Sequence, residues 1–176
     1  MSIKLVILDI DGVLTDGTKM YDINGKCFAK KFCDSDFTAI KRLKANGLNV
    51  CFLSGDKTIN EAIAKNRSID FYHCPKGRYK EEFLDFLSGH YSVASTEMLY
   101  IGDDIFDIKI SMSVKFAFCP NNAASDLKSV CGADNILSSK GGHGVIKELH
   151  DKLLARGLIK ATTIDDIKIL DEIETW

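Results

Sequence analysis

Short apolar runs alternate with amphipathic segments along this chain, and that alternation limits the possible folds more than any other feature. Four runs rich in β-branched or aromatic residues span 4–9, 48–53, 98–101 and 115–118. Between the runs, apolar residues recur at helical spacing in 37–43, before Gly47, and in 83–87, with an end expected near Gly89. Strands that alternate with helices predict βαβ units, so we expect an α/β three-layer sandwich around a mainly parallel sheet.

One segment after the first run departs from this rhythm. Asp22-Ile23-Asn24-Gly25 lies between short alternating runs, and Asn-Gly favours a tight hairpin turn. We therefore predict a β-hairpin flap over about 15–33. The glycines of 141–144 predict a turned loop before a helix that begins near Val145. The C-terminal tail, about 162–176, is expected to contain a helix over 163–173.

Length and charge narrow the class of protein. A chain of 176 residues fits one domain, so we assign 1–176 to a single domain. The 23 Lys and Arg balance 25 Asp and Glu without a block of one sign, which favours neither a nucleic acid nor a membrane as partner. The apolar run before Asp9 is too short for a signal peptide, so we expect a cytoplasmic protein. Its six cysteines form no Cys-x-x-Cys pair and are expected to be reduced.

Acidic and small polar residues follow three of the four apolar runs. In a parallel α/β sheet, the loops at the carboxyl ends of the strands form the ligand site, so these residues should lie at one edge. Lys80 lies between the second and third groups in the sequence. The residues are Asp9, Asp11 and Gly12 after the first run, Ser54 and Gly55 after the second, and Gly102, Asp103, Asp104 and Asp107 after the third.

Several carboxylates at one edge would repel one another unless a divalent cation neutralised them, and hard oxygen ligands suit Mg²⁺. A lysine, a hydroxyl and a cation beside a carboxylate are also what a phosphoryl group needs. Each feature alone has an ordinary explanation, because an Asp-x-Asp commonly caps a turn and a single lysine commonly faces solvent. Their joint occurrence in a fixed order at strand ends favours phosphate chemistry.

These residues resemble the four motifs of the haloacid dehalogenase superfamily of phosphatases. The motifs correspond to 9–15, Ser54, Lys80 and 102–107, and the resemblance implies a Rossmann-like fold. More narrowly, 11–17, the short flap and 141–148 resemble the capless branch that contains phosphatases of 3-deoxy-D-manno-octulosonate 8-phosphate and of nonulosonate 9-phosphates, the sialic-acid type sugars. The branch implies a sugar-acid phosphate as substrate, in sialic acid or octulosonate biosynthesis, and a homotetramer built through the flaps.

The resemblance also implies a role for each motif residue. Asp9 would attack phosphorus, and Asp11 would protonate the leaving alcohol and later activate water. Mg²⁺ would be held by Asp9, Asp103 and the backbone carbonyl of Asp11. Residues that orient its bound waters would be Asp104 and Asp107. Residues that hold the phosphoryl oxygens would be Ser54, Gly55 and Lys80.

Substrate recognition depends on positions where this chain departs from the octulosonate phosphatases. Those enzymes often have an arginine where this chain has Asp56, which cannot pair with a substrate carboxylate but can accept hydrogen bonds from hydroxyls. That exchange favours a nonulosonate 9-phosphate over an octulosonate 8-phosphate, although Asp56 could instead cap a helix entered near Thr58. Further candidate substrate contacts are Lys76, Arg78 and His143.

Two other functions fit the composition of the site. A non-enzymatic phospho-receiver domain also gathers carboxylates and a lysine at a sheet edge, but its lysine comes last, whereas Lys80 precedes Asp103 here. An inactive relative retained as an oligomerisation module is the second alternative. The order of the motifs favours the phosphatase.

Overall fold

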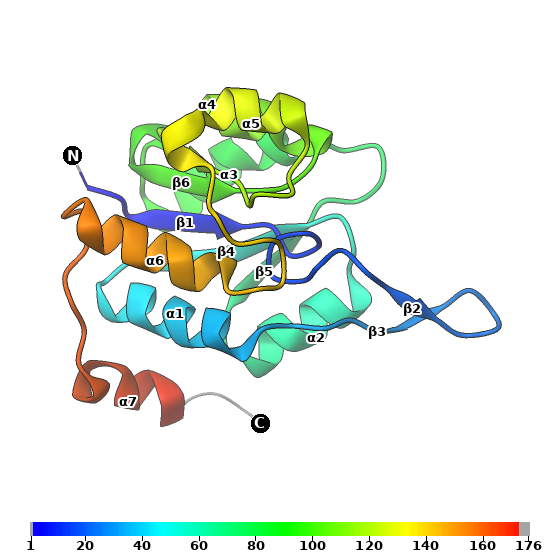
Figure 1. Ribbon diagram of the computed structural model, residues 1–176, viewed down its shortest axis with the longest axis horizontal. Coiled ribbons are helices and arrows are strands. Elements are labelled where there is room, and N and C mark those ends of the chain that lie inside the picture. The colour runs from blue at the N-terminus through cyan, green and yellow to red at the C-terminus, as the bar shows by residue number, and fades with distance from the viewer. Residues whose placement is uncertain (1, 173–176) are drawn as a thin grey trace.

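A computed structural model describes residues 2–172 of the chain, and its centre is a parallel sheet of five strands (Figure 1). Their order is β5-β4-β1-β6-β7, and all neighbouring pairs are parallel. The strands are β1 (Leu5–Leu8), β4 (Asn49–Ser54), β5 (Asp70–His73), β6 (Met98–Ile101) and β7 (Phe116–Phe118). The predicted α/β sandwich is confirmed, and the four predicted strands are found with ends shifted by at most one residue.

Strand β5 has no counterpart among the predicted strands. Its residues, Asp70-Phe71-Tyr72-His73, are half-buried or exposed because the strand lies at the edge of the sheet. An edge strand needs no continuous apolar run, so the sequence pattern does not mark it.

Helices cover both faces of the sheet (Figure 1). Alternate residues of β1 divide between two cores: Val6 and Leu8 pack with α1, α2 and α6, whereas Leu5 and Ile7 pack with α3 and α4. The α-helices are α1 (Asp34–Ala45), α2 (Thr58–Asn66), α3 (Leu84–Tyr91), α4 (Ile108–Ser113), α5 (Ser125–Cys131), α6 (Val145–Ala155) and α7 (Ile164–Glu172). The 3₁₀ turns are η1 (Lys80–Phe83), η2 (Ser95–Glu97), η3 (Ile105–Asp107) and η4 (Ala133–Asn135).

The predicted flap is a two-stranded antiparallel hairpin that projects from the body of the molecule (Figure 1). Its strands are β2 (Met20–Tyr21) and β3 (Cys27–Ala29). Asp22 Oδ1 accepts hydrogen bonds from the backbone N–H groups of Asn24 and Lys26, and Gly25 has a φ of +74°. Asn-Gly therefore closes the turn, as the sequence indicates.

The prediction that the helix over 83–87 ends near Gly89 is wrong by two residues. Helix α3 continues through Gly89 to Tyr91 and ends at Ser92, which takes the left-handed conformation with a φ of 55°. Helix α6 begins at Val145, as expected. Helix α7 packs against α1, where Lys41 forms an ion pair with Asp171, and the predicted residues 173–176 of the tail lie outside the described part.

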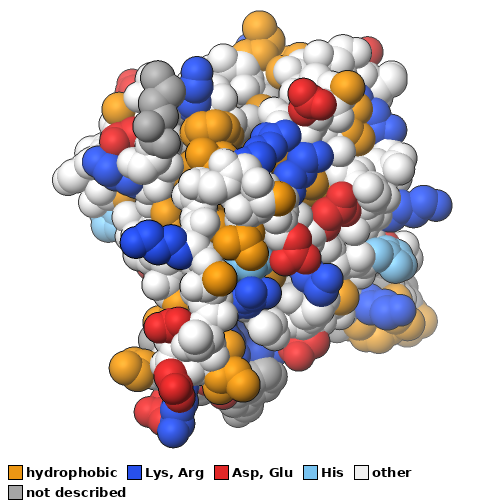
Figure 2. All heavy atoms as spheres, turned by 60° about the vertical axis from the view of Figure 1, so that its left-hand side comes forward, with side chains coloured by type: hydrophobic (Ala, Val, Ile, Leu, Met, Phe, Trp, Pro, Cys, Tyr) orange, Lys and Arg blue, Asp and Glu red, His pale blue; other side chains and the backbone are white. Residues whose placement is uncertain are grey.

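All six cysteines are free thiols, four of them buried. None of the helices within residues 2–172 has the length and apolar character needed to cross a bilayer. On the face shown in Figure 2, acidic and basic side chains are interspersed.

Candidate active site

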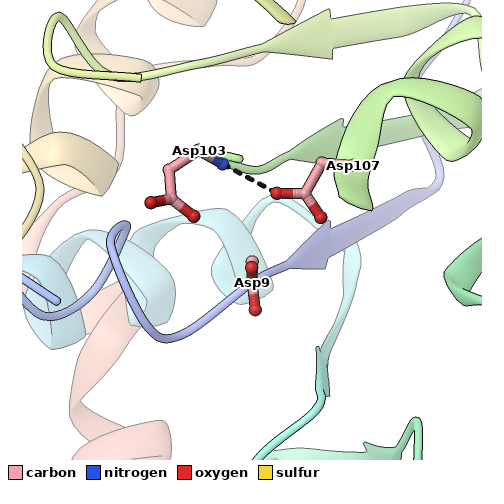
Figure 3. A group of neighbouring side chains, drawn as sticks. All are labelled: Asp9, Asp103 and Asp107. Atoms are coloured by element: carbon pink, nitrogen blue, oxygen red, sulfur yellow. Dashed lines mark hydrogen bonds between the residues drawn. The ribbon is translucent and has the colours of Figure 1, made fainter. Parts of the chain in front are cut away.

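Three carboxylates from the segments that follow two neighbouring strands converge at the carboxyl edge of the sheet (Figure 3). Asp9 follows β1, Asp103 follows β6, and Asp107 ends η3. One oxygen from each lies within 4.8 Å of the others. The register accounts for this, because Leu8 at the end of β1 pairs with Ile101 at the end of β6. The structure thus brings together acidic residues that are almost a hundred positions apart in the chain.

Two glycines make this convergence possible. Gly12 has a φ of +85°, and a Cβ at this position would lie 1.9 Å from Asp103 Oδ2. A Cβ on Gly102 would lie 2.4 Å from Asp107 Cγ. Any larger residue at either position would displace a carboxylate of the cluster.

Asp107 is held by four hydrogen bonds. Its Oδ1 accepts from Lys80 Nζ at 2.7 Å and from the Tyr100 hydroxyl at 2.6 Å. Its Oδ2 accepts from the backbone N–H groups of Asp103 at 2.9 Å and Asp104 at 3.0 Å, the first of which is drawn in Figure 3. Burial alone would raise the pKa of Asp107, but the charge of Lys80 and these bonds hold it below its ordinary value. Asp107 is therefore an ionised carboxylate that positions its neighbours.

Asp9 and Asp103, unlike Asp107, have pKa values above the ordinary value. Burial, opposed by Lys80 and reinforced by Asp107, raises the pKa of Asp9 to about 7. Burial and the charges of Asp9 and Asp107 raise the pKa of Asp103 to about 8. Within residues 2–172, no hydrogen bond reaches the Asp103 carboxylate, whereas Asp9 accepts from Lys80 Nζ at 2.6 Å and from Ile10 N at 2.8 Å. A carboxylate such as Asp103, which none of these residues neutralises, is a ligand that suits a hard divalent cation.

Ser54 and Asp11 are joined by a side chain that the sequence did not single out. Asn60, buried in α2, donates from Nδ2 to Ser54 Oγ at 2.9 Å and to Asp11 Oδ2 at 3.1 Å. Asp11 Oδ2 also accepts from Lys30 Nζ at 2.9 Å. The serine that ends β4 and the second acid of the first loop are thus linked across the site.

Asp56 faces the flap. Its Oδ2 accepts hydrogen bonds from Lys19 Nζ at 2.9 Å and Lys30 Nζ at 2.8 Å. The alternative expectation that Asp56 caps a helix is wrong, because α2 has Lys57 at its N-cap and no side-chain cap hydrogen bond. The two flap lysines provide stronger, charge-assisted partners for this carboxylate.

A cavity of about 930 Å³ opens over these groups. Every candidate site residue lines it except His143, whose Nδ1 lies 2.7 Å from the backbone oxygen of Gly141. Arg78 lines the cavity and forms an ion pair with Glu82. The lining candidates are Asp9, Asp11, Ser54, Gly55, Asp56, Lys76, Arg78, Lys80, Asp103, Asp104 and Asp107.

Sequence reasoning missed four polar residues that contact the motif residues, namely Lys19, Lys30, Asn60 and Tyr100. The position of Asn60 on the inner face of an amphipathic helix could have indicated it, because a polar side chain buried there needs hydrogen-bond partners. The two lysines belong to a flap that is otherwise exposed, and the tyrosine lies within an apolar run, so the pattern gives no signal for them.

The chain is similar to known phosphatases over most of its length. It is 32% identical over 154 residues to the 3-deoxy-D-manno-octulosonate 8-phosphate phosphatase of Haemophilus influenzae, which covers 87% of this chain and 83% of the relative. The Escherichia coli enzyme of the same name is 28% identical over 157 residues, with 87% and 80% covered. No family model matches the chain.

Solved structures agree with these relatives. The cobalt-bound Haemophilus influenzae phosphatase has a TM-score of 0.79 and 34% identity, and the match covers 89% of this chain and 90% of that one. The Moraxella catarrhalis phosphatase, solved with a magnesium ion, a phosphate ion and the octulosonate sugar, has a TM-score of 0.78 and 27% identity, with 87% and 86% covered. The matches favour the phosphatase over the receiver domain and the inactive module. The chain is a phosphatase that belongs to the family of 3-deoxy-D-manno-octulosonate 8-phosphate phosphatases, within the haloacid dehalogenase superfamily.

Proposed function

We propose that this phosphatase hydrolyses the phosphate monoester of a 3-deoxy-2-ulosonic sugar acid, with Mg²⁺ as cofactor. The observation that carries the proposal is the meeting of Asp9, Asp11, Ser54 and Lys80 in one cavity of about 930 Å³. The names of the relatives support the same substrate class.

In the first step, a carboxylate oxygen of Asp9 forms a bond to phosphorus while the bond between phosphorus and the sugar oxygen breaks. The electron pair of that bond goes to the sugar oxygen, which takes a proton from Asp11 and leaves as an alcohol. Phosphate-monoester hydrolysis is among the slowest uncatalysed reactions, so a covalent route that divides it into two displacements is an advantage.

In the second step, water attacks the phosphorus of the aspartyl phosphate. Asp11 removes a proton from this water, and Asp9 is released as a carboxylate with inorganic phosphate as product. Asp11 therefore acts first as an acid and then as a base, and returns to its starting state.

The donor set fits the proposed cation. Asp9, Asp103 and the backbone carbonyl of Asp11 would hold Mg²⁺, and Asp107 and Asp104 would orient its water ligands. The four hydrogen bonds already made by Asp107 argue against a direct bond from it to the cation, because both its oxygens accept from neighbouring protein groups. When bound, Mg²⁺ neutralises the carboxylates and the phosphoryl oxygens.

Ser54 and Lys80 would bind the phosphoryl oxygens. The Lys80 ammonium lies 2.6 Å from Asp9 Oδ2, so a phosphoryl group attached to Asp9 would be within its reach. Asn60 holds Ser54 Oγ by donating to it, which leaves the serine hydroxyl hydrogen for the substrate. Gly55, at the cavity wall, has no side chain that would keep the phosphoryl group away.

Among sugar acids, we favour a nonulosonate 9-phosphate over an octulosonate 8-phosphate. Both flap lysines bond to Asp56 Oδ2, and Oδ1 accepts no hydrogen bond from residues 2–172. That free oxygen can accept from a hydroxyl of the longer sugar chain. Lys76 and Arg78 line the cavity and are the candidates for the substrate carboxylate, with His143 reserved for a neighbouring subunit.

We also propose that the chain is a homotetramer assembled through its flaps. Four large apolar side chains of the hairpin are exposed, which favours burial against another copy. Their exposed fractions are 56% for Met20, 58% for Tyr21, 101% for Ile23 and 58% for Phe28.

The test is phosphate release with Mg²⁺ from a nonulosonate 9-phosphate, octulosonate 8-phosphate and a simple hexose phosphate, offered side by side. We expect the sugar-acid phosphates to be preferred, the nine-carbon substrate most, and Asp9→Asn to have no detectable turnover. Preference for the eight-carbon substrate would overturn the role of Asp56 alone. No release from either sugar acid by the wild-type enzyme would overturn the proposed function.

A further inference from the structure

Lys30 is a buried lysine whose ammonium lies inside the active site although its backbone belongs to the flap. Its side chain has an exposed fraction of 0%. Nζ donates to Asp11 Oδ2 at 2.9 Å, to Asp56 Oδ2 at 2.8 Å and to Asn60 Oδ1 at 2.9 Å. An ammonium has three hydrogens, so these three acceptors satisfy it completely.

The geometry of the hairpin accounts for this position. Met20 of β2 pairs with Ala29 of β3, so the residues just outside that pair, Lys19 and Lys30, lie next to each other on the two legs of the flap. Both reach Asp56, but only Lys30 donates a hydrogen bond to Asp11. Nearer the body of the protein, Thr15 and Phe32 form a further bridge between the legs, which fixes the base of the flap.

Lys30 and Asn60 hold the same oxygen of Asp11. Both donate to Oδ2, whereas Oδ1 is buried and accepts no hydrogen bond from the described residues, although Lys30 Nζ lies 2.8 Å from it. Two donors on one oxygen fix the plane of a carboxyl group that could otherwise rotate about its side-chain torsions. The Asp11 carboxyl group is thus held in one orientation by contacts that come from the flap and from α2.

We infer that Lys30 is a positioning residue for catalysis, which fixes the Asp11 carboxyl group in the orientation needed for proton transfer and thereby couples that orientation to the conformation of the flap. This inference rests on the proposed function, because it takes Asp11 as the acid that protonates the leaving group. Lys30 is not among the residues that line the cavity, and its side chain has no exposed surface, so it does not touch the substrate. Its effect should therefore appear in kcat and not in KM.

A positioning role and a purely structural role of Lys30 predict different rates for substrates with different leaving groups. A sugar alcohol leaves only if it is protonated, whereas p-nitrophenolate leaves without a proton. Formation of the aspartyl phosphate from p-nitrophenyl phosphate therefore does not need Asp11, but formation from a sugar phosphate does. Loss of correct positioning should slow the first step with sugar phosphates selectively, whereas general loosening of the site should slow both substrates alike.

The experiment compares Lys30→Met with Lys31→Met, in which the neighbouring exposed lysine receives the same substitution. Single-turnover rates of leaving-group release are measured for a sugar-acid phosphate and for p-nitrophenyl phosphate, and steady-state kinetics give kcat and KM. We expect Lys30→Met to reduce sugar release and kcat about 100-fold, with KM within about threefold and p-nitrophenolate release within about fivefold of wild type. Lys31→Met should match the wild type for both substrates.

Asp11→Asn provides the reference, because it should show the same difference between leaving groups. Lys30→Met combined with Asp11→Asn should release sugar no more slowly than Asp11→Asn alone, since the lysine acts through that carboxyl group. Lys30→Gln, which keeps a hydrogen-bond donor, should show the same selectivity to a smaller extent.

Equal slowing of both leaving groups, or a change in KM alone, would overturn the inference, as would failure of both Lys30 variants to fold by circular dichroism, because Lys30 would then be a structural residue. If the wild-type enzyme releases no sugar, the proposed function fails instead. An active wild type with a selective Asp11→Asn defect and an unaffected Lys30→Met would overturn the inference alone.

Discussion

The raised pKa values of Asp9 and Asp103 predict that the metal-free protein loses stability as the pH rises. Both carboxyl groups have ordinary pKa values of 3.8, and the folded protein raises them to about 7 and about 8. At a pH between the ordinary and the raised pKa of either group, the folded state holds a proton that the unfolded state has released. A raised pKa of this kind gives stability that is complete below the ordinary value and is lost as the pH rises through the folded value.

The size of the effect follows from the buried carboxyl group. One group that is protonated in the folded state and ionised in the unfolded state changes the free energy of unfolding by about 1.4 kcal/mol per pH unit. Asp9 is buried, so its ionisation should lower the free energy of unfolding by about 2 kcal/mol between pH 5 and pH 7, where it reaches half ionisation. The partly exposed Asp103 adds less, because solvent screens it. Groups with lowered pKa values, such as Asp107, are ionised in both states in this window and do not contribute.

The assay is thermal unfolding from pH 5 to pH 8, with a chelator and with Mg²⁺. A loss of about 2 kcal/mol corresponds to a Tm decrease of roughly 4–8 °C for a chain of this length. Mg²⁺ requires ionised ligands, so the Tm increase that it produces should be larger at pH 8 than at pH 5. Asp103→Asn should reduce both the pH slope and the effect of Mg²⁺. Asp126→Asn, which alters an exposed carboxylate of α5, should change neither.

Two results would refute this reasoning. Metal-free protein that keeps or gains stability between pH 5 and pH 7 would show that the folded site does not retain protons there. A Tm increase with Mg²⁺ that is the same at pH 5 and pH 8 would show that the cation does not compete with those protons.

Three further predictions concern the packing of the site and the flap. Gly12→Ala should abolish the Tm increase produced by Mg²⁺, because a Cβ there would lie 1.9 Å from Asp103 Oδ2; a normal increase would show that the loop can adapt. Tyr100→Phe removes the hydroxyl that donates to Asp107 and should lower the free energy of unfolding in urea by about 1–3 kcal/mol; no change would mean that water replaces it. Ile23→Asp, at the exposed tip of the flap, should give a smaller assembly by sedimentation velocity while the circular dichroism spectrum stays unchanged; an unchanged assembly would exclude the flap as its interface.

The sequence predicted the parts of the fold and the site that depend on local pattern. Strand β1 is buried on both faces, so it reads as a continuous apolar run, and the acidic residue after it must lie at the sheet edge. Asn24-Gly25 closes the flap because few dipeptides adopt the required turn conformation. Both inferences need only the residues of one segment.

The remaining features depend on which distant segments meet. Lys30 resembles any other lysine of an exposed hairpin until the flap legs place it against Asp11 and Asp56. In the sequence, Tyr100 is an ordinary member of an apolar run. Only the folded structure shows that its hydroxyl contacts Lys80 and Asp107. No local pattern marks such contacts, because each joins segments of the chain that are adjacent only in the folded state.

The counterions of the site explain where a cation is still needed. Lys80 pairs with Asp9 and Asp107, and Lys30 pairs with Asp11 and Asp56. Neither lysine contacts the Asp103 carboxylate, which has no partner among residues 2–172. The negative charge that still needs a cation is therefore that of Asp103, beside Asp9.

The same balance of charge predicts the effect of placing an arginine at position 56. An arginine in place of Asp56 would face both Lys19 and Lys30, whose ammonium groups now share Asp56 Oδ2. Three cations would then meet beside Asp11, and like charges at that distance repel. Asp56 and Lys19 therefore belong together as an electrostatic unit. We expect Asp56→Arg alone to displace Lys30 from the Asp11 carboxyl group, so a test of the proposed role of Asp56 in substrate preference should exchange Lys19 together with Asp56.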